Sequence, residues 1–124
     1  MTMKYLAPML MAVLPLPACA ADLVCVPDTV CIDADCQKGH DDKAEVQLRN
    51  WTSAKPVLHS AYGNVPTTGR KGTDMLQWSG RNTDNQIETL SLRPSDMHFT
   101  YVIALEPGSV VEKLTSKGHC AVTE

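Results

Sequence analysis

The sequence predicts a small all-β domain: an antiparallel meander or closed barrel of about seven to eight strands, stapled by disulfides, after an N-terminal signal peptide. Three observations lead to this prediction. Short apolar segments alternate with turn residues, and no segment carries a long 3.6-residue repeat. An apolar leader opens the chain. Four cysteines follow that leader, an even number that favours two disulfides in an oxidising compartment.

The leader is expected to be a signal peptide that covers residues 1–20. Residues 5–17 form an apolar stretch too short to span a bilayer, and Ala18-Cys19-Ala20 supplies the small residues that a signal peptidase reads. Residues 21–124 would then form a single β domain, periplasmic or secreted. In a second interpretation the stretch before the cut is a bacterial lipobox, and a lipid on Cys19 anchors the chain.

Alternation of apolar and polar residues places the strands within the mature chain. Pro27-Asp28 is expected to be a tight turn between the first two strands, and residues 63–72, rich in Gly, Pro and Thr, are expected to form a loop. The expected strands are residues 23–26, 29–32, 44–49, 56–62, 75–79, 86–92, 99–105 and 110–115.

The last hairpin has the clearest pattern. Pairing Leu105 with Val110 is expected, which places Ile103 opposite Glu112 and gathers most large apolar groups on one face. The same two-residue period, continued along the last strand, turns Cys120 toward the core.

The cysteines are expected to close the barrel. Cys25 shares the inward face of its strand, and an even meander brings the first and last strands side by side, so a Cys25–Cys120 bridge would staple that seam. Cys31 and Cys36 would then close a small local loop, although the other two connectivities stay open. A zinc site of Cys25, Cys31, Cys36 and His40 is the alternative, but it lacks the short C-x2-C spacing of structural zinc sites.

Charge argues against several functions. The mature chain carries ten Lys and Arg (eleven minus Lys4) against fourteen Asp and Glu, a balance of −4, which disfavours nucleic acid. No segment after the leader is apolar enough to span a membrane. The acids around Asp33 and Asp35 do not follow the order of a calcium loop, so a solvated acidic loop is expected, with no metal and no cofactor.

The sequence contains no spacing that indicates catalysis. Neither His-Glu-x-x-His nor Gly-x-Ser-x-Gly occurs, so the chain is not expected to be an enzyme. A small barrel can be filled by its own side chains or can hold one small ligand. The expected function is therefore that of an exported, non-catalytic β module that binds a protein or a small ligand in the periplasm.

Two resemblances accompany these patterns. Cys25-x5-Cys31-x4-Cys36 and the closing Gly118-His119-Cys120 resemble small exported proteins of alphaproteobacteria. That resemblance implies an exported context and no particular activity.

The second resemblance is to the periplasmic inhibitors of C-type lysozymes. Ser60-Ala61-Tyr62-Gly63 is similar to their Ser-Ala-Ser-Gly loop, and Trp78-Ser79-Gly80 is similar to their Trp-x-Lys-Gly strand. Tyr62 replaces the second serine, and no lysine follows Trp78. The resemblance implies a disulfide-stapled barrel and an alternative function, lysozyme inhibition. Its partner-binding residues would be Ser60, Tyr62, Gly63 and Trp78.

Overall fold

A computed structural model describes residues 21–39, 44–105 and 112–123. The expected signal peptide, including Cys19, and the proposed zinc ligand His40 lie outside the described residues. Within the described ranges, no helix has the length and apolarity that a membrane crossing requires.

The described chain is all-β and antiparallel, which confirms the expected fold class. The strands are β1 (Asp22–Ile32), β2 (Asp35–Lys38), β3 (Val46–Arg49), β4 (Val57–Ser60), β5 (Gly63–Pro66), β6 (Thr68–Lys71), β7 (Leu76–Arg81), β8 (Ile87–Arg93), β9 (His98–Ala104) and β10 (Lys113–Thr123). Hydrogen bonding orders them β5-β4-β3-β1-β10-β9-β8-β7-β6, with β2 attached to β1. The first and last strands are therefore neighbours, as a closed meander requires.

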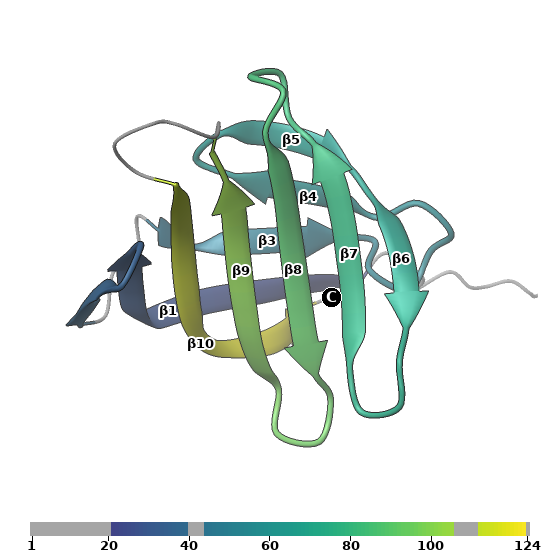
Figure 1. The fold of residues 1–124 in the computed structure, drawn as a ribbon. Helices are drawn as coiled ribbons and strands as arrows, with labels where there is room; N and C mark the ends of the chain where they lie inside the picture. The colour runs from purple at the N-terminus through teal and green to yellow at the C-terminus, as the bar shows by residue number, and fades with distance from the viewer. Residues whose placement is uncertain (1–20, 40–43, 106–111, 124) are drawn as a thin grey trace, which may run out of the picture.

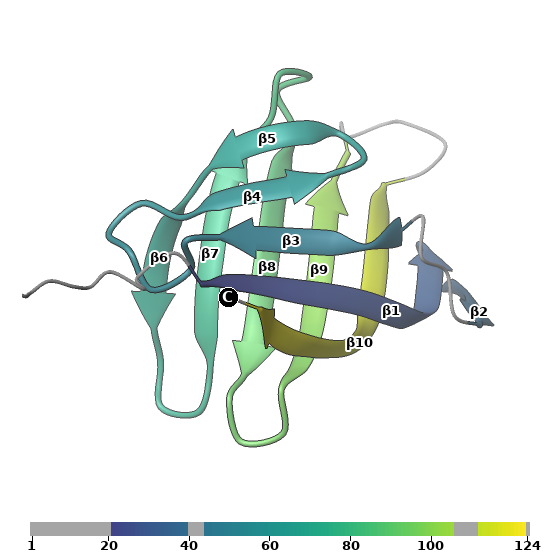
Figure 2. The ribbon, with the colours of Figure 1, turned by 180° about the vertical axis from the view of Figure 1, so that it is seen from behind.

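The sheet folds over on itself into a nearly closed barrel. In Figure 1, β6 to β10 stand upright in front, while β1, β3, β4 and β5 run across behind them. The view from behind in Figure 2 shows the same crossing and the bend by which β10 turns from one layer toward the other. Because β10 pairs with β9 on one side and β1 on the other, this bent strand joins the two layers.

The expected turn at Pro27-Asp28 is wrong, because β1 runs through it without a break. Pro27 pairs with Gly118 and Thr29 with Lys117, so Asp28 is an extra residue in a β-bulge. A Cβ on Gly118 would lie 2.3 Å from the carbonyl oxygen of Val26, and only glycine permits this close approach. Proline is tolerated here because a bulge locally interrupts the ladder.

The expected loop at 63–72 is also wrong, because β5 and β6 occupy most of it. These two strands and β2 raise the number to ten, while the two expected N-terminal strands merge into β1. β5 and β6 are each four residues long, and they are the two ends of the hydrogen-bonded order, so each pairs on one side. Short end strands of this kind carry little apolar alternation, which explains why the sequence did not predict them.

Thr67, between β5 and β6, is tied to the residue that precedes β4. The backbone N–H and the hydroxyl of Thr67 both donate to the carbonyl of Pro56, at 3.0 and 2.7 Å. A Cβ on Gly80 would meet the carbonyl oxygen of Pro66 at 2.3 Å, so β5 lies directly against β7. These contacts bring the two ends of the hydrogen-bonded order together.

The register of the last hairpin differs from the expected one by two residues. Ile103 pairs with Leu114, and the N–H of Leu105 donates to the carbonyl of Glu112. Val110, the expected partner of Leu105, lies outside the described residues. A shift of two residues preserves the face of every side chain, so Cys120 still points inward.

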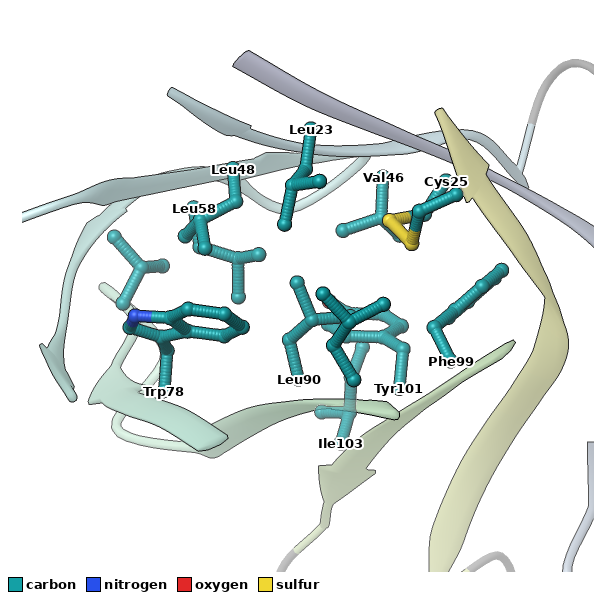
Figure 3. Packing of buried hydrophobic residues seen from close by; sticks show 13 residues of the cluster. Leu23, Cys25, Val46, Leu48, Leu58, Trp78, Leu90, Phe99, Tyr101 and Ile103 are labelled. Carbon is teal, nitrogen blue, oxygen red and sulfur yellow. A yellow bond between two sulfur atoms is a disulfide. The ribbon is translucent and has the colours of Figure 1, made fainter. Parts of the chain in front are cut away.

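The core lies between the two layers, and Figure 3 shows their side chains meeting there. The buried cluster contains Leu23, Cys25, Val46, Leu48, Leu58, Val65, Trp78, Leu90, Leu92, Phe99, Tyr101, Ile103 and Cys120. Cys25 and Cys120 pair across β1 and β10 and form the expected disulfide within this cluster. The second expected disulfide, Cys31–Cys36, joins β1 to β2.

Candidate functional site

A pocket of about 210 Å³ lies at one end of the barrel, next to the turn that joins β4 to β5. Its walls come from β1, β9, β10, the start of β3 and the end of β4, so residues from both layers line it. The lining residues are Val30, Ala44, Glu45, Val46, Ser60, Ala61, Tyr62, Tyr101, Ile103, Leu114 and Ser116. We call this end of the barrel the hollow end.

A buried carboxylate lies behind the pocket. Glu88, on β8, is fully buried, and its Oε1 accepts hydrogen bonds from the Tyr101 hydroxyl at 2.5 Å and from Ser60 Oγ at 3.2 Å. Its Oε2 accepts one from Asn82 Nδ2 at 2.8 Å. A buried carboxylate without partners would be strongly destabilising, and these three donors supply the partners that it needs.

The turn between β7 and β8 fixes the third donor. Asn82 Oδ1 accepts the backbone N–H groups of Asp84, at 3.0 Å, and of Gln86, at 2.9 Å. The amide nitrogen of Asn82 must then point the other way, toward Glu88. The turn between β7 and β8 therefore also orients a donor for the buried carboxylate.

The Tyr101 hydroxyl remains protonated under ordinary conditions. Burial raises the pKa of Tyr101 far above its usual range, and the hydrogen bond to Glu88 raises it further. A protonated phenol has one proton to donate, and Tyr101 donates it to the carboxylate. The remaining hydrogen-bonding capacity of this oxygen is that of an acceptor.

The proton of the Ser60 hydroxyl is also used within the protein. Its hydroxyl donates to Glu88 and accepts the backbone N–H of Tyr62 at 3.1 Å. A second carboxylate, that of Glu45, also lines the pocket, and its Oε2 accepts a hydrogen bond from Gln47 Nε2 at 2.8 Å. The polar atoms around the apolar walls are therefore dominated by acceptors.

Three of the four residues proposed as partner-binding lie together at the hollow end. Ser60 is buried at the pocket, Tyr62 is 39% exposed at its lining, and Gly63 begins β5 with a φ of 101° that favours glycine. Trp78 lies apart from them. It is 6% exposed in the core and packs edge-on against Trp51, with ring centroids 6.4 Å apart.

Glu88 and Ser116 were not predicted from the sequence as site residues. The signal for Glu88 was present: Leu90 and Leu92 face inward on β8, so the two-residue period also turns Glu88 inward. Ser116 faces inward in the same way, in step with Cys120 on β10. What the sequence did not show is that these two positions flank one pocket.

The acidic loop contributes contacts within the protein. Both carboxylate oxygens of Asp33 accept the backbone N–H of Glu112, at 3.0 and 3.3 Å, and its Oδ1 also accepts that of Lys113 at 2.9 Å. Asp33 therefore ties the β1–β2 turn to the start of β10. In the part of the chain that the structure describes, no group of three or more His, Cys, Asp or Glu residues could hold a metal ion.

Comparisons of this chain with protein-family models, with curated proteins and with solved structures found no match.

Proposed function

We propose that the protein is an exported, non-catalytic β module that binds a small ligand in the pocket at the hollow end. The observation that carries this proposal is the pocket itself, which combines apolar walls with a few oriented polar groups. Ligand sites commonly have this composition and often occupy the mouth of a β-barrel.

The volume of the pocket bounds the size of the ligand. A protein cavity of about 150 Å³ lined by apolar side chains is known to hold benzene. At about 210 Å³, this pocket suits a molecule somewhat larger than benzene, or a single side chain of a partner protein. We favour the free small molecule because the lining residues come from both layers and form a concave, mainly apolar site.

The site chemistry supports binding in preference to catalysis. Ser60 is the lining hydroxyl that a carboxylate could activate as a nucleophile, because it donates to Glu88. That carboxylate also accepts hydrogen bonds from Tyr101 and Asn82, so it is not available as a general base. Among the described lining residues there is no histidine to accept a proton. Export to the periplasm or beyond is part of the proposal, and two disulfides suit an oxidising compartment.

Titration with 2-phenylethanol, a neutral probe of suitable size, tests the pocket by calorimetry. The oxidised protein should bind it, and Ser116→Leu should abolish binding because the larger side chain fills the pocket. Ser95→Leu, at an exposed turn, is the matched control and should bind like the natural protein. Equal binding by both variants, or none by the natural protein, would reject the proposal.

A second candidate is inhibition of a C-type lysozyme. The 39% exposed Tyr62 favours it, because this side chain stands at the hairpin that the resemblance identifies. Trp78, the other half of the resemblance, is buried. Purified protein at micromolar concentration should slow such a lysozyme, and Tyr62→Ala should relieve the effect. Unchanged lysozyme activity retires this candidate without affecting the first.

A further inference from the structure

We infer that the pocket selects a primary amine carried on a small apolar body, with the ammonium group held near Tyr101 and Ser60. This inference rests on the proposed function and adds the chemical class of the ligand. It follows from where the hydroxyl protons point, from which charges surround the pocket, and from what its walls exclude.

The protons decide what the floor of the pocket can offer. Tyr101 and Ser60 both donate to the same oxygen of Glu88. Each hydroxyl has one proton, so a ligand that reaches these oxygens meets lone pairs. Ser60 already accepts the N–H of Tyr62, which leaves Tyr101 as the better placed acceptor. A ligand group with several N–H donors can hydrogen-bond to these lone pairs, whereas a carboxylate has only acceptors and cannot.

The charges favour the same group. Glu45 lines the pocket and Glu88 lies behind it, and every hydrogen-bond donor to Glu88 in the described chain is neutral. No lysine, arginine or histidine is among the described lining residues. Because Coulomb interactions strengthen away from water, a cation gains and an anion loses on entering this pocket.

The walls determine the rest of the ligand. Val30, Val46, Ile103 and Leu114 present aliphatic carbon to the pocket, so the body of the ligand is apolar. Ser116 also lines the pocket, and its hydroxyl can turn to accept from an ammonium group or to donate to another oxygen. Burial of an ammonium group needs several acceptors to replace water, and the hydroxyl oxygens of Tyr101 and Ser116 can supply two of them.

Three probes with one skeleton test the inference: 2-phenylethylamine, 2-phenylethanol and phenylacetate, each titrated calorimetrically into the oxidised protein. The amine should bind about tenfold more tightly than the alcohol, and the alcohol more tightly than the acid, because the head groups differ in charge and in their numbers of donors and acceptors. Equal affinities, or a preference for the acid, would overturn the inference while leaving the pocket as a binding site. Binding of none of the three would reject the proposed function as well.

Variants then locate the selectivity. Glu88→Gln keeps an acceptor for Tyr101 but removes the charge, and it should reduce the preference for the amine about tenfold while affinity for the alcohol stays within about twofold. Asp74→Asn removes an exposed carboxylate in the β6–β7 turn and should change neither affinity. An unchanged preference in Glu88→Gln would contradict the role of Glu88. If Glu88→Gln fails to fold, Tyr101→Phe tests the other half of the inference: it leaves the charge of Glu88 but removes the hydroxyl that donates to Glu88 and would accept from the ammonium group. An unchanged preference for the amine in Tyr101→Phe would contradict the role of Tyr101.

Discussion

The two ends of this barrel are built from the same strands, yet one is filled and the other is hollow. At the filled end, β1 contributes Leu23 and β10 contributes Cys120, and both pack into the core. At the hollow end the same strands contribute Val30 and Ser116, which line the pocket. β1 pairs with β10 at both ends, but the bulge at Asp28 lies between them, and the other neighbour of β1 is β3 at the filled end and β2 at the hollow end. The two ends therefore differ in backbone pairing as well as in side-chain volume and polarity.

The buried carboxylate shows what maintains the hollow end. Three inward-facing positions alternate along β8. Leucine fills the second and third of them, at Leu90 and Leu92, whereas the first is Glu88. Glu88 requires hydrogen-bond donors, and the hydroxyls of Ser60 and Tyr101 supply two of them. These hydroxyls stand at the pocket where apolar groups would otherwise fill the core. A polar network of this kind costs stability unless every member is satisfied, and the three donors to Glu88 meet that condition.

The largest expected difference concerns the two disulfides. Cys25–Cys120 closes a loop of 95 residues at the filled end, and chain-entropy estimates give about 4–5 kcal/mol for its removal. Cys31–Cys36 closes a loop of 5 residues beyond the hollow end, for which the same relation gives about 2 kcal/mol. Urea unfolding of the double alanine variants of each pair measures both free energies. Equal losses would show that the seam is not stapled by the first bridge.

Matched leucine truncations come next in size. Leu23→Ala, at a fully buried position of the filled end, should lower the free energy of unfolding by about 3–5 kcal/mol because a cavity remains. Leu114 borders the pocket at the hollow end, so Leu114→Ala enlarges a space that already exists. It should lower the free energy of unfolding by about 1 kcal/mol. The ordering is the test: a larger loss at Leu114 would mean that the hollow end is in fact packed.

The smallest expected effect is that of an exposed ion pair at the filled end. The Arg93 guanidinium donates to Asp96 at 2.9 and 2.7 Å and, with the backbone N–H of His98, holds the pKa of that carboxyl well below its usual range. A lowered pKa contributes stability above the ordinary carboxyl pKa, and this contribution is lost as the pH falls through the folded value.

Asp96→Asn should therefore lower stability slightly at about pH 6 and converge on the natural protein in strong acid. Urea midpoints at the two pH values measure the change. A variant that is as stable as the natural protein at both would show that solvent screens this pair completely. A loss as large as that of Leu23→Ala would contradict its exposed position.

Much of the filled end could be predicted from the sequence, because alternation and parity are local signals. The inward facing of Cys25 and Cys120 followed from counting residues in twos, and it survived a register error of two because that shift preserves the face. The bulge at Asp28 could not be predicted, since Pro-Asp is also a good turn sequence and only the contact with Gly118 distinguishes the two.

The hollow end was harder to predict because its residues are brought together by tertiary structure. Ser60 and Glu88 come from opposite layers, 28 residues apart, and no spacing in the sequence links them. Tyr101 alternates with the buried Phe99 and Ile103 on β9, and it is 5% exposed in the core. That its hydroxyl meets a carboxylate depends on how the two layers cross, which alternation within a strand does not encode.

We propose that one end of the barrel is a ligand site and that the other is structural. A nitrogen–proton NMR titration of the oxidised protein with 2-phenylethylamine tests it most directly, because each backbone amide reports on its own surroundings. We expect the amide shifts to concentrate at 45–46, 60–62, 101–103 and 114–116, while the amides of Leu23 and Leu92 at the filled end stay unchanged. Shifts centred on the filled end, or spread evenly over the surface, would contradict it.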